Sequence, residues 1–360
     1  MDRQLLFTTA IPLLIFTGSA MHRPDDDLLI REITNHPSAS AGAERSFRTF
    51  IEKFEKEYGS REEYLLRLGI FARNLARAAE HQLLDPTAVH GITPFSDLTE
   101  EEFERTMMGL TEPASPFSVA ELPSSLDAKD LPENFDWREK GAVTDVKMQG
   151  PCGSCWAFST TGAVEGANFV ATGNLLRLSE QQLIDCDHTC DAKEKDACDN
   201  GCKGGLMTNA YGYLMRVGGL QNDSSYPYTG RQEACKFERA KVAVKVTNFT
   251  SIALDEDQIA ANLVIRGPLA VGLNAVFMQT YMGGVSCPLI CSKRRVNHGV
   301  VLVGYGSKGY APLRLGYRSY WIIKNSWGKR WGEQGYYKLC RGHGMCGMNT
   351  MVSAVAATSS

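Results

Sequence analysis

An amide side chain and two thiols lie within seven residues of each other, as Gln149, Cys152 and Cys155. The glycines and proline of residues 150–153 disfavour a helix before Cys155, whereas residues 156–171 repeat apolar side chains at helical spacing. We therefore expect Cys155 at the start of a helix. The positive end of the helix dipole there stabilises a thiolate, which is the form of cysteine that attacks a carbonyl carbon.

The C-x-x-C spacing of Cys152 and Cys155 is also typical of thioredoxin-like redox pairs and of zinc sites. The flanking residues favour another function, because the run Cys-Gly-Ser-Cys-Trp ending at Trp156 resembles the signature of papain-type cysteine proteases, which include the cathepsins. A disulfide oxidoreductase would need both thiols to cycle together, so a stable Cys152–Cys202 bridge would exclude it.

The resemblance assigns further catalytic roles. It implies that His298 is the general base, that Asn325 orients the imidazole under the cover of Trp327, and that the Gln149 amide forms an oxyanion hole with the Cys155 N–H. The separations of 143 and 170 residues from Cys155 to His298 and Asn325 suit the family. Without the resemblance, a histidine such as His298 is more often a surface or buried structural residue than a catalyst, and the run around Asn325 also fits a turn. All four catalytic positions are intact, which argues against an inactive binding or storage relative.

The resemblance also implies an apolar pocket for the substrate residue P2, two before the cleaved bond. The family's substrate-binding positions correspond here to Gly204, Gly205, Leu206, Met207, Gly272, Val296, Gly299, Met351 and Trp327. Burial of a leucine, valine or phenylalanine side chain would stabilise binding by about 25 cal/mol per Å². The chain lacks a histidine-rich occluding insertion of the exopeptidase kind, so we expect a cysteine endopeptidase (class EC 3.4.22) with neither cofactor nor metal.

The N-terminus reads as a signal peptide, residues 1–20. An apolar run over residues 5–20 follows Arg3, contains Pro12 and ends in small residues. It is shorter than the roughly 20 apolar residues of a membrane span, although an N-terminal anchor remains the alternative. No other segment is apolar enough to cross a bilayer, so we expect a soluble product of the secretory pathway, lysosomal, vacuolar or extracellular. A net charge of −3 argues against a nucleic-acid partner.

Residues 21–130 contain no cysteine. The spacing of their apolar residues predicts one helix over 47–58 and a second that begins at Ser60, where Ser60 and Glu63 form a capping box. Polar and apolar residues at intervals of three and four fit an ordinary amphipathic helix with a solvated edge. They also match the interspersed propeptide motif of the cathepsin F-like branch: Glu63, Arg67, Phe71, Asn74, Ala78 and Gln82. A second propeptide motif comprises Gly91, Thr93, Phe95 and Asp97. A third helix opens at Thr99 with Glu102.

The resemblance implies that residues 21–130 are an inhibitory propeptide that runs through the active-site groove backwards. We expect residues 111–130, rich in proline and serine, to be the linker across the cleft and the place of cleavage, with the mature enzyme beginning near Leu131. Our hypothesis for activation is that Glu63 and Asp97 lose charge in acid and weaken the ion pairs that hold the propeptide.

All eleven cysteines lie between residues 152 and 346, and an odd number predicts one free thiol besides the pairs. Family alignment implies Cys152–Cys202, Cys186–Cys235 and Cys291–Cys346. Cys190–Cys198 and Cys287–Cys340 would complete the set. A zinc site of Cys186, Cys190, Cys198 and Cys202 with His188 is the alternative, which the secretory context disfavours.

The fold class expected is α+β, a papain-like fold of two parts that follows the propeptide. The mature domain, 131–360, would consist of a helical left part (about 131–240) and an antiparallel, barrel-like right part (about 241–360), with the active site in the cleft between them. Asn222 and Asn248 lie in glycosylation sequons. The expected partners are protein and peptide substrates, the chain's own propeptide and cystatin-like inhibitors, with the enzyme itself a monomer.

Overall fold

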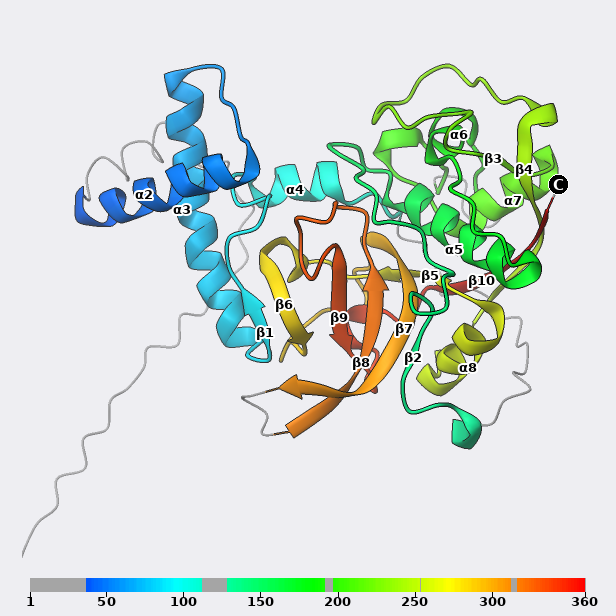
Figure 1. The fold of residues 1–360 in the computed structure, drawn as a ribbon. Helices are drawn as coiled ribbons and strands as arrows, with labels where there is room; N and C mark the ends of the chain where they lie inside the picture. The colour runs from blue at the N-terminus through cyan, green and yellow to red at the C-terminus, as the bar shows by residue number, and fades with distance from the viewer. Residues whose placement is uncertain (1–36, 112–127, 192–196, 253, 312–315, 360) are drawn as a thin grey trace, which may run out of the picture.

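The computed structural model describes residues 37–111, 128–191, 197–252, 254–311 and 316–359 (Figure 1). The expected signal peptide and most of the expected linker lie outside these ranges. Within them, every helix is too short or too polar to pass through a lipid bilayer. The α+β class expected from the sequence is confirmed: helices α5 to α7 gather on one side of the mature domain and most strands on the other.

The first described elements of the prosegment are two crossing helices, α2 (Pro37–Phe54) and α3 (Arg61–Leu84) (Figure 1). Phe47 and Phe50 of α2 pack against Phe71 of α3 with ring centroids 5.2 and 5.1 Å from it. The prediction that the first helix reaches residue 58 is wrong. The helix stops at Phe54 because Glu55 adopts a left-handed conformation with φ 54°.

Ser60 caps α3 as predicted, because its side chain accepts the N–H of Glu63. The reciprocal half of the predicted capping box is wrong: the Glu63 carboxylate accepts the N–H of Gly59, one residue earlier, at 2.8 Å. Both halves form at α4 (Glu100–Met107), where Thr99 and Glu102 make the complete box. The α4 helix leads the chain from the prosegment toward the mature domain (Figure 1).

The polar edge of α3 faces protein and not solvent. Asn74 donates to the carbonyls of Ser96 and Leu98, at 2.8 and 2.7 Å, and Gln82 bonds the backbone of Ala88 and His90. Arg67 pairs with Glu102 at 2.7 Å. The side chains of the propeptide motif on α3 therefore hold the segment that follows the helix, including the short strand β1 (Ala88–His90), against α3.

The helical part of the mature domain consists of α5 (Cys155–Thr172), α6 (Glu180–Cys186) and α7 (Met207–Val217), followed by β3 (Leu220–Gln221). The central helix α5 is buried along most of its length and ends at Gly173, whose φ is 76°. It contacts α6, α7 and strands of the other part, so its N-terminus lies where the two parts meet.

Ten strands of the described residues join in one sheet, whose main path runs β1-β6-β9-β8-β7-β5-β10-β4-β3, with β2 on β7. The strands are β2 (Phe135–Asp136), β4 (Val242–Ser251), β5 (Leu269–Leu273), β6 (Tyr281–Ser286), β7 (His298–Ala311), β8 (Gly316–Lys324), β9 (Tyr336–Cys340) and β10 (Val352–Ser359). Helix α8 (Glu256–Arg266) packs against β7 and β10. Because β5, β7 and β8 pair antiparallel, they bring His298 and Asn325 into one edge of this part.

Five disulfides form in the mature domain, and they are the five pairs named from the sequence. They join Cys152–Cys202, Cys186–Cys235, Cys190–Cys198, Cys287–Cys340 and Cys291–Cys346. In the described part of the chain Cys155 is the free cysteine, and no cluster of potential metal ligands occurs there. The four cysteines of the zinc alternative are all in these bridges, and the redox pair loses Cys152 to Cys202.

Candidate active site

Cys155 is the first residue of α5, as its sequence predicts, and is completely buried. The N–H of Gly299 donates to its sulfur at 3.3 Å. The N–H groups of Trp156 and Cys155 itself also face the sulfur and favour its ionised form. The chain therefore holds the thiol against the N–H of Gly299, the residue that follows His298 at the start of β7.

His298 has one ring nitrogen fixed and the other open. Its Nε2 lies 2.8 Å from Oδ1 of Asn325, and an amide oxygen only accepts, so Nε2 carries the proton. Among the described residues no partner contacts Nδ1, which is left with a lone pair. The indole of Trp327 stacks on the imidazole at 4.6 Å and shields the bond to Asn325. A neutral imidazole with a free Nδ1 beside a thiol can accept that thiol's proton.

Gln149 lies at the position expected of an oxyanion donor. Its Nε2 donates to the carbonyl of Met107 at 3.1 Å, while Ser326 Oγ holds its Oε1 at 2.7 Å. The hydroxyl of Ser326 thus keeps the donor face of the amide turned toward the cleft. No sequence pattern predicts this role of Ser326, because it depends on contact between residues 177 positions apart.

Residues 107–111 of the prosegment lie in the cleft, whereas most of the predicted linker 111–130 falls outside the described residues. Thr111 N–H donates to Gly205 O at 3.1 Å, and Gly205 N–H donates to Gly109 O at 3.0 Å, which makes a parallel bridge around Leu110. Leu110 also donates its N–H to Asn297. A strand without hydrophobic periodicity is invisible in the sequence when its partner is distant.

Leu110 fills an apolar pocket. It is buried in one cluster with Leu206, Met207, Val296 and Met351, all of them predicted pocket residues. Gly272 closes this pocket, since a Cβ there would lie 2.7 Å from Met351 and 2.8 Å from Leu110. Two predicted positions have other contacts: Gly299 lies against Cys155, and Trp327 covers His298. Gly204 and Gly205 pair with the prosegment backbone.

Burial in the proenzyme opposes charge on both members of the pair. Burial raises the pKa of Cys155 to about 12, against the four backbone N–H groups that favour the thiolate. Burial likewise lowers the pKa of His298 to about 4, although the hydrogen bond that His298 donates to Asn325 favours the charged form. With the prosegment in place the two groups are therefore a neutral thiol and a neutral imidazole, and the ionised pair expected from the sequence has to await exposure of the cleft.

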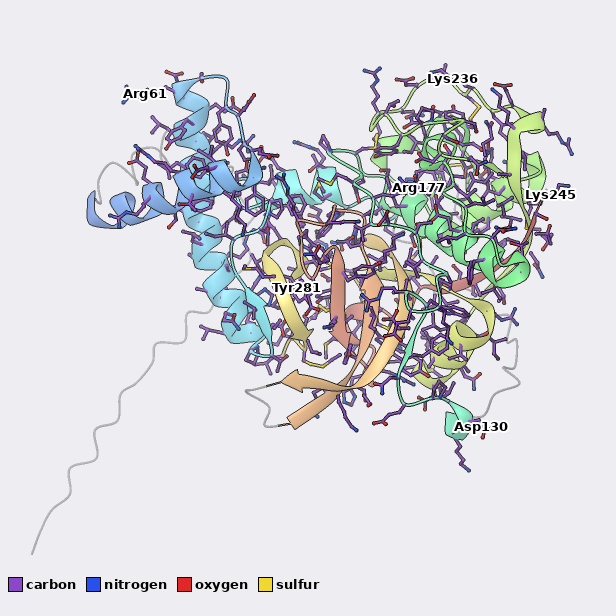
Figure 2. The ribbon with its side chains drawn as sticks, in the orientation of Figure 1. Arg61, Asp130, Arg177, Lys236, Lys245 and Tyr281 are labelled. Atoms are coloured by element: carbon purple, nitrogen blue, oxygen red, sulfur yellow. A yellow bond between two sulfur atoms is a disulfide. The ribbon has the colours of Figure 1, made fainter. Side chains whose placement is uncertain are left out.

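A second prosegment contact lies on β6 and the turn before it. His81 Nδ1 and His90 Nδ1 both contact Thr280 Oγ1, at 2.7 and 2.8 Å, and Asp85 accepts from His90 Nε2 and from Ser286. We call His81, Asp85, His90, Thr280 and Ser286 the histidine cluster. Tyr281, which stacks edge-on with His90, marks its place (Figure 2).

The following arrangement of protons satisfies every contact of the histidine cluster. Asp85 accepts from His90 Nε2, His90 Nδ1 accepts from Thr280, and the Thr280 oxygen accepts from His81. Burial, helped by His90 and Arg77, lowers the pKa of His81 to about 3. Glu63 and Asp97 make their contacts within the prosegment, to Gly59, Lys56 and Tyr58. The prosegment carboxylates that pair with the mature domain are others, Glu104 with Arg295 at 2.7 Å and Glu55 with Arg330 at 2.9 Å.

Known protein families match nearly all of the described chain. The family described as papain family cysteine protease matches residues 131–356, and the cathepsin propeptide inhibitor domain (I29) matches residues 47–103. A probable cysteine protease of Arabidopsis thaliana, RD19D, is 65% identical over 92% of this chain and 92% of its own length. Mouse cathepsin F is 45% identical over 86% of this chain and 64% of its own.

Solved proenzymes share the fold. The structure of digestive procathepsin L 3 from the larval midgut of Tenebrio molitor superposes with a TM-score of 0.72 at 34% identity, covering 87% of this chain and 99% of that one. A recombinant stem bromelain precursor gives a TM-score of 0.75 at 29% identity, covering 88% of this chain and 99% of its own.

Proposed function

Because this chain belongs to the papain family of cysteine proteases and carries a cathepsin-type inhibitor propeptide, we propose that it cleaves peptide bonds by attack of Cys155, assisted by His298, once residues 21–130 are removed. The observation that carries this proposal is the position of the prosegment, whose Met107 carbonyl accepts a hydrogen bond from the Gln149 amide. A substrate carbonyl in that place would be within reach of the same amide.

The reaction would proceed in two steps. Cys155 transfers its proton to Nδ1 of His298 and its sulfur bonds to the carbonyl carbon, while Gln149 and the Cys155 N–H hold the charge that develops on oxygen. The carbon–nitrogen bond then breaks, and His298 returns the proton to the leaving amine. Water, deprotonated by His298, hydrolyses the thioester and regenerates the enzyme. Asn325 keeps the ring in the orientation that both steps need.

The proposed zymogen is restrained by both geometry and charge. The prosegment strand fills the cleft, and its burial of Cys155 and His298 keeps both neutral. Purified proenzyme held at mildly acidic pH should shorten to a form that begins near Leu131, and peptidase activity should rise in parallel. A chain that never shortens, and stays inactive after its prosegment is cut away by another protease, would overturn the proposal.

A leucine or a similarly sized apolar residue is proposed at P2, because the prosegment places Leu110 in the pocket closed by Gly272. Substrates with aspartate or lysine at P2 would bury a charge without a partner and should be poor.

Gly272→Ala should narrow this pocket. The added methyl group would crowd Met351, Val296 and the δ-methyl of a bound leucine, so selectivity for leucine over valine at P2 should fall about 10-fold in kcat/KM. Fluorogenic peptides that differ only at P2 measure this. The control is Gly212→Ala on α7, where no atom lies within 4 Å of the added Cβ. Equal losses for both peptides in Gly272→Ala would show that the pocket lies elsewhere.

We propose a compartment of the secretory pathway as its destination, lysosomal, vacuolar or extracellular. The five disulfides support this, because such bridges persist in oxidising compartments. Asn248 is exposed on β4 and Asn222 is half-buried beside β3, so Asn248 is the more accessible of the two proposed glycosylation sites. A monomer inhibited by cystatin-like proteins remains part of the proposal.

A further inference from the structure

Two carboxyl groups meet in the protein interior behind the substrate-binding segment Gly204–Leu206. Asp187 follows the end of α6 and Asp199 precedes residues 201–203, and both side chains are at most 1% exposed. The Cys190–Cys198 disulfide and the backbone bond from Asp199 N–H to Thr189 O close the loop that brings them together. The two carboxyl groups contact each other directly.

Each carboxyl has one oxygen bonded and one that faces the other acid. Asp187 Oδ1 accepts the Thr189 N–H at 2.9 Å, and Asp199 Oδ1 accepts the Leu206 N–H at 2.7 Å. Neither Oδ2 receives a hydrogen bond from any donor in the described part of the chain, and both are buried. Two carboxylates cannot satisfy one another, because both only accept; a carboxylic acid and a carboxylate can.

The surroundings oppose a second negative charge. Asp187 stands at the C-terminus of α6, where the helix dipole is itself negative. From α7 the groups that face the pair are Tyr213, which is neutral, and Arg216, which bonds Thr189 and favours the Asp187 charge. Burial and Asp187 raise the pKa of Asp199 well above its usual range. Burial also raises the pKa of Asp187, so the pair favours retaining one proton, and Arg216 near Asp187 favours that proton on Asp199.

The pair connects to the cleft through a single residue. Asp199 holds the N–H of Leu206, and its Oδ1 would lie 2.8 Å from a Cβ on Gly205, so the carboxyl packs against the Gly205 backbone. Gly205 is the residue that pairs with the strand in the cleft through both its N–H and its carbonyl. Displacement of the Asp199 side chain would move the backbone on which an extended peptide aligns.

We propose that Asp187 and Asp199 share one proton, and that the protonated pair positions Gly204–Leu206 for substrate binding. The inference rests on the function proposed above and makes Asp199 a positioning residue. When the shared proton is lost, two buried like charges repel and Asp199 releases Leu206. Substrate binding then weakens at alkaline pH while Cys155 and His298 stay in place, so the fall in kcat/KM appears in KM and not in kcat.

The test compares Asp199→Asn and Asp199→Ala with wild type in the prosegment-free enzyme. Asparagine keeps Oδ1 for Leu206 and supplies an N–H to Asp187 that does not titrate. For wild type, KM should rise with pH by up to about tenfold per unit once the shared proton dissociates. Asp199→Asn should hold KM within about twofold over the same range, since it has no proton to lose. Asp199→Ala should raise KM at every pH. Asp145→Asn, on an exposed carboxylate, is the control.

A second readout separates positioning from folding. Infrared difference spectra should show a protonated-carboxyl band in wild type at pH 6 that is missing from Asp199→Asn. Active sites are counted beforehand with an epoxide that alkylates the nucleophile; a wild type that takes no label would refute the proposed function itself. If the enzyme takes the label, two results would contradict the proposal that the two carboxyl groups share a proton. One is a KM–pH profile of Asp199→Asn that parallels wild type, and the other is an infrared band that is unchanged in Asp199→Asn.

Discussion

Cys155→Ser proenzyme is expected to show no self-processing and no covalent labelling by an epoxide inhibitor of cysteine proteases. A serine hydroxyl is a far weaker acid than a thiol, so a site arranged for a thiolate should lose at least ~10⁴-fold in kcat/KM. The measurement is intact mass after acid treatment with the inhibitor, followed by peptide mapping. Wild type should take up one label, on Cys155.

The disulfides make this measurement unambiguous. The other ten cysteines are in the five bridges, so a label on Cys155 can be distinguished from chance alkylation. Cys155→Ser should leave the fold intact, because the sulfur's hydrogen bond from Gly299 can pass to the serine oxygen. A label on another residue, or processing that continues in Cys155→Ser without added protease, would contradict the assignment of the nucleophile.

Acid should loosen the prosegment through His81. In the docked state the pKa of His81 is about 3, whereas a released histidine titrates near its ordinary value of 6.5. Above pH 6.5 His81 is neutral in both states, so docking does not depend on its proton. Between pH 6.5 and 3 the released state binds one proton more, and docking weakens as pH falls. At pH 4 the loss is roughly 300-fold in the docking equilibrium, about 3 kcal/mol.

The test measures how fast a trace of active enzyme cleaves the prosegment of Cys155→Ser proenzyme between pH 7 and pH 4. The Cys155→Ser background is used because it cannot process itself. Adding His81→Gln should move the onset of prosegment cleavage to lower pH, because glutamine keeps a hydrogen bond to Thr280 and takes up no proton. His343→Gln, an exposed histidine of the mature domain, is the control. If Asp97→Asn shifts the onset and His81→Gln does not, the carboxylate hypothesis drawn from the sequence is the correct one.

Local chemistry made the nucleophile predictable. Glycine and proline before Cys155 and a long apolar repeat after it leave one place for a helix to begin, and α5 begins there. Ser60 and Thr99 gave the starts of α3 and α4 in the same way. His298 could be selected from seven histidines only through the family resemblance, since its contacts come from strand pairing.

What the sequence could not reveal depends on partners distant along the chain. Leu110 binds in the cleft because its backbone pairs with Gly205, and no local pattern reports such a register. Asp199 looked like one more charge in an acidic loop until the Asp187 carboxyl was found beside it. The histidine cluster likewise joins residues about 190 to 200 positions apart.

The closed cleft also protects the sulfur from chemical damage. Peroxides oxidise thiolates that solvent can reach, and in the proenzyme Cys155 is neither ionised nor exposed. The proenzyme can therefore be stored in an oxidising compartment with its reactive atom intact. Once the prosegment is removed, the sulfur is exposed to oxidants. The time for which each enzyme molecule stays active then depends on the reductants around it.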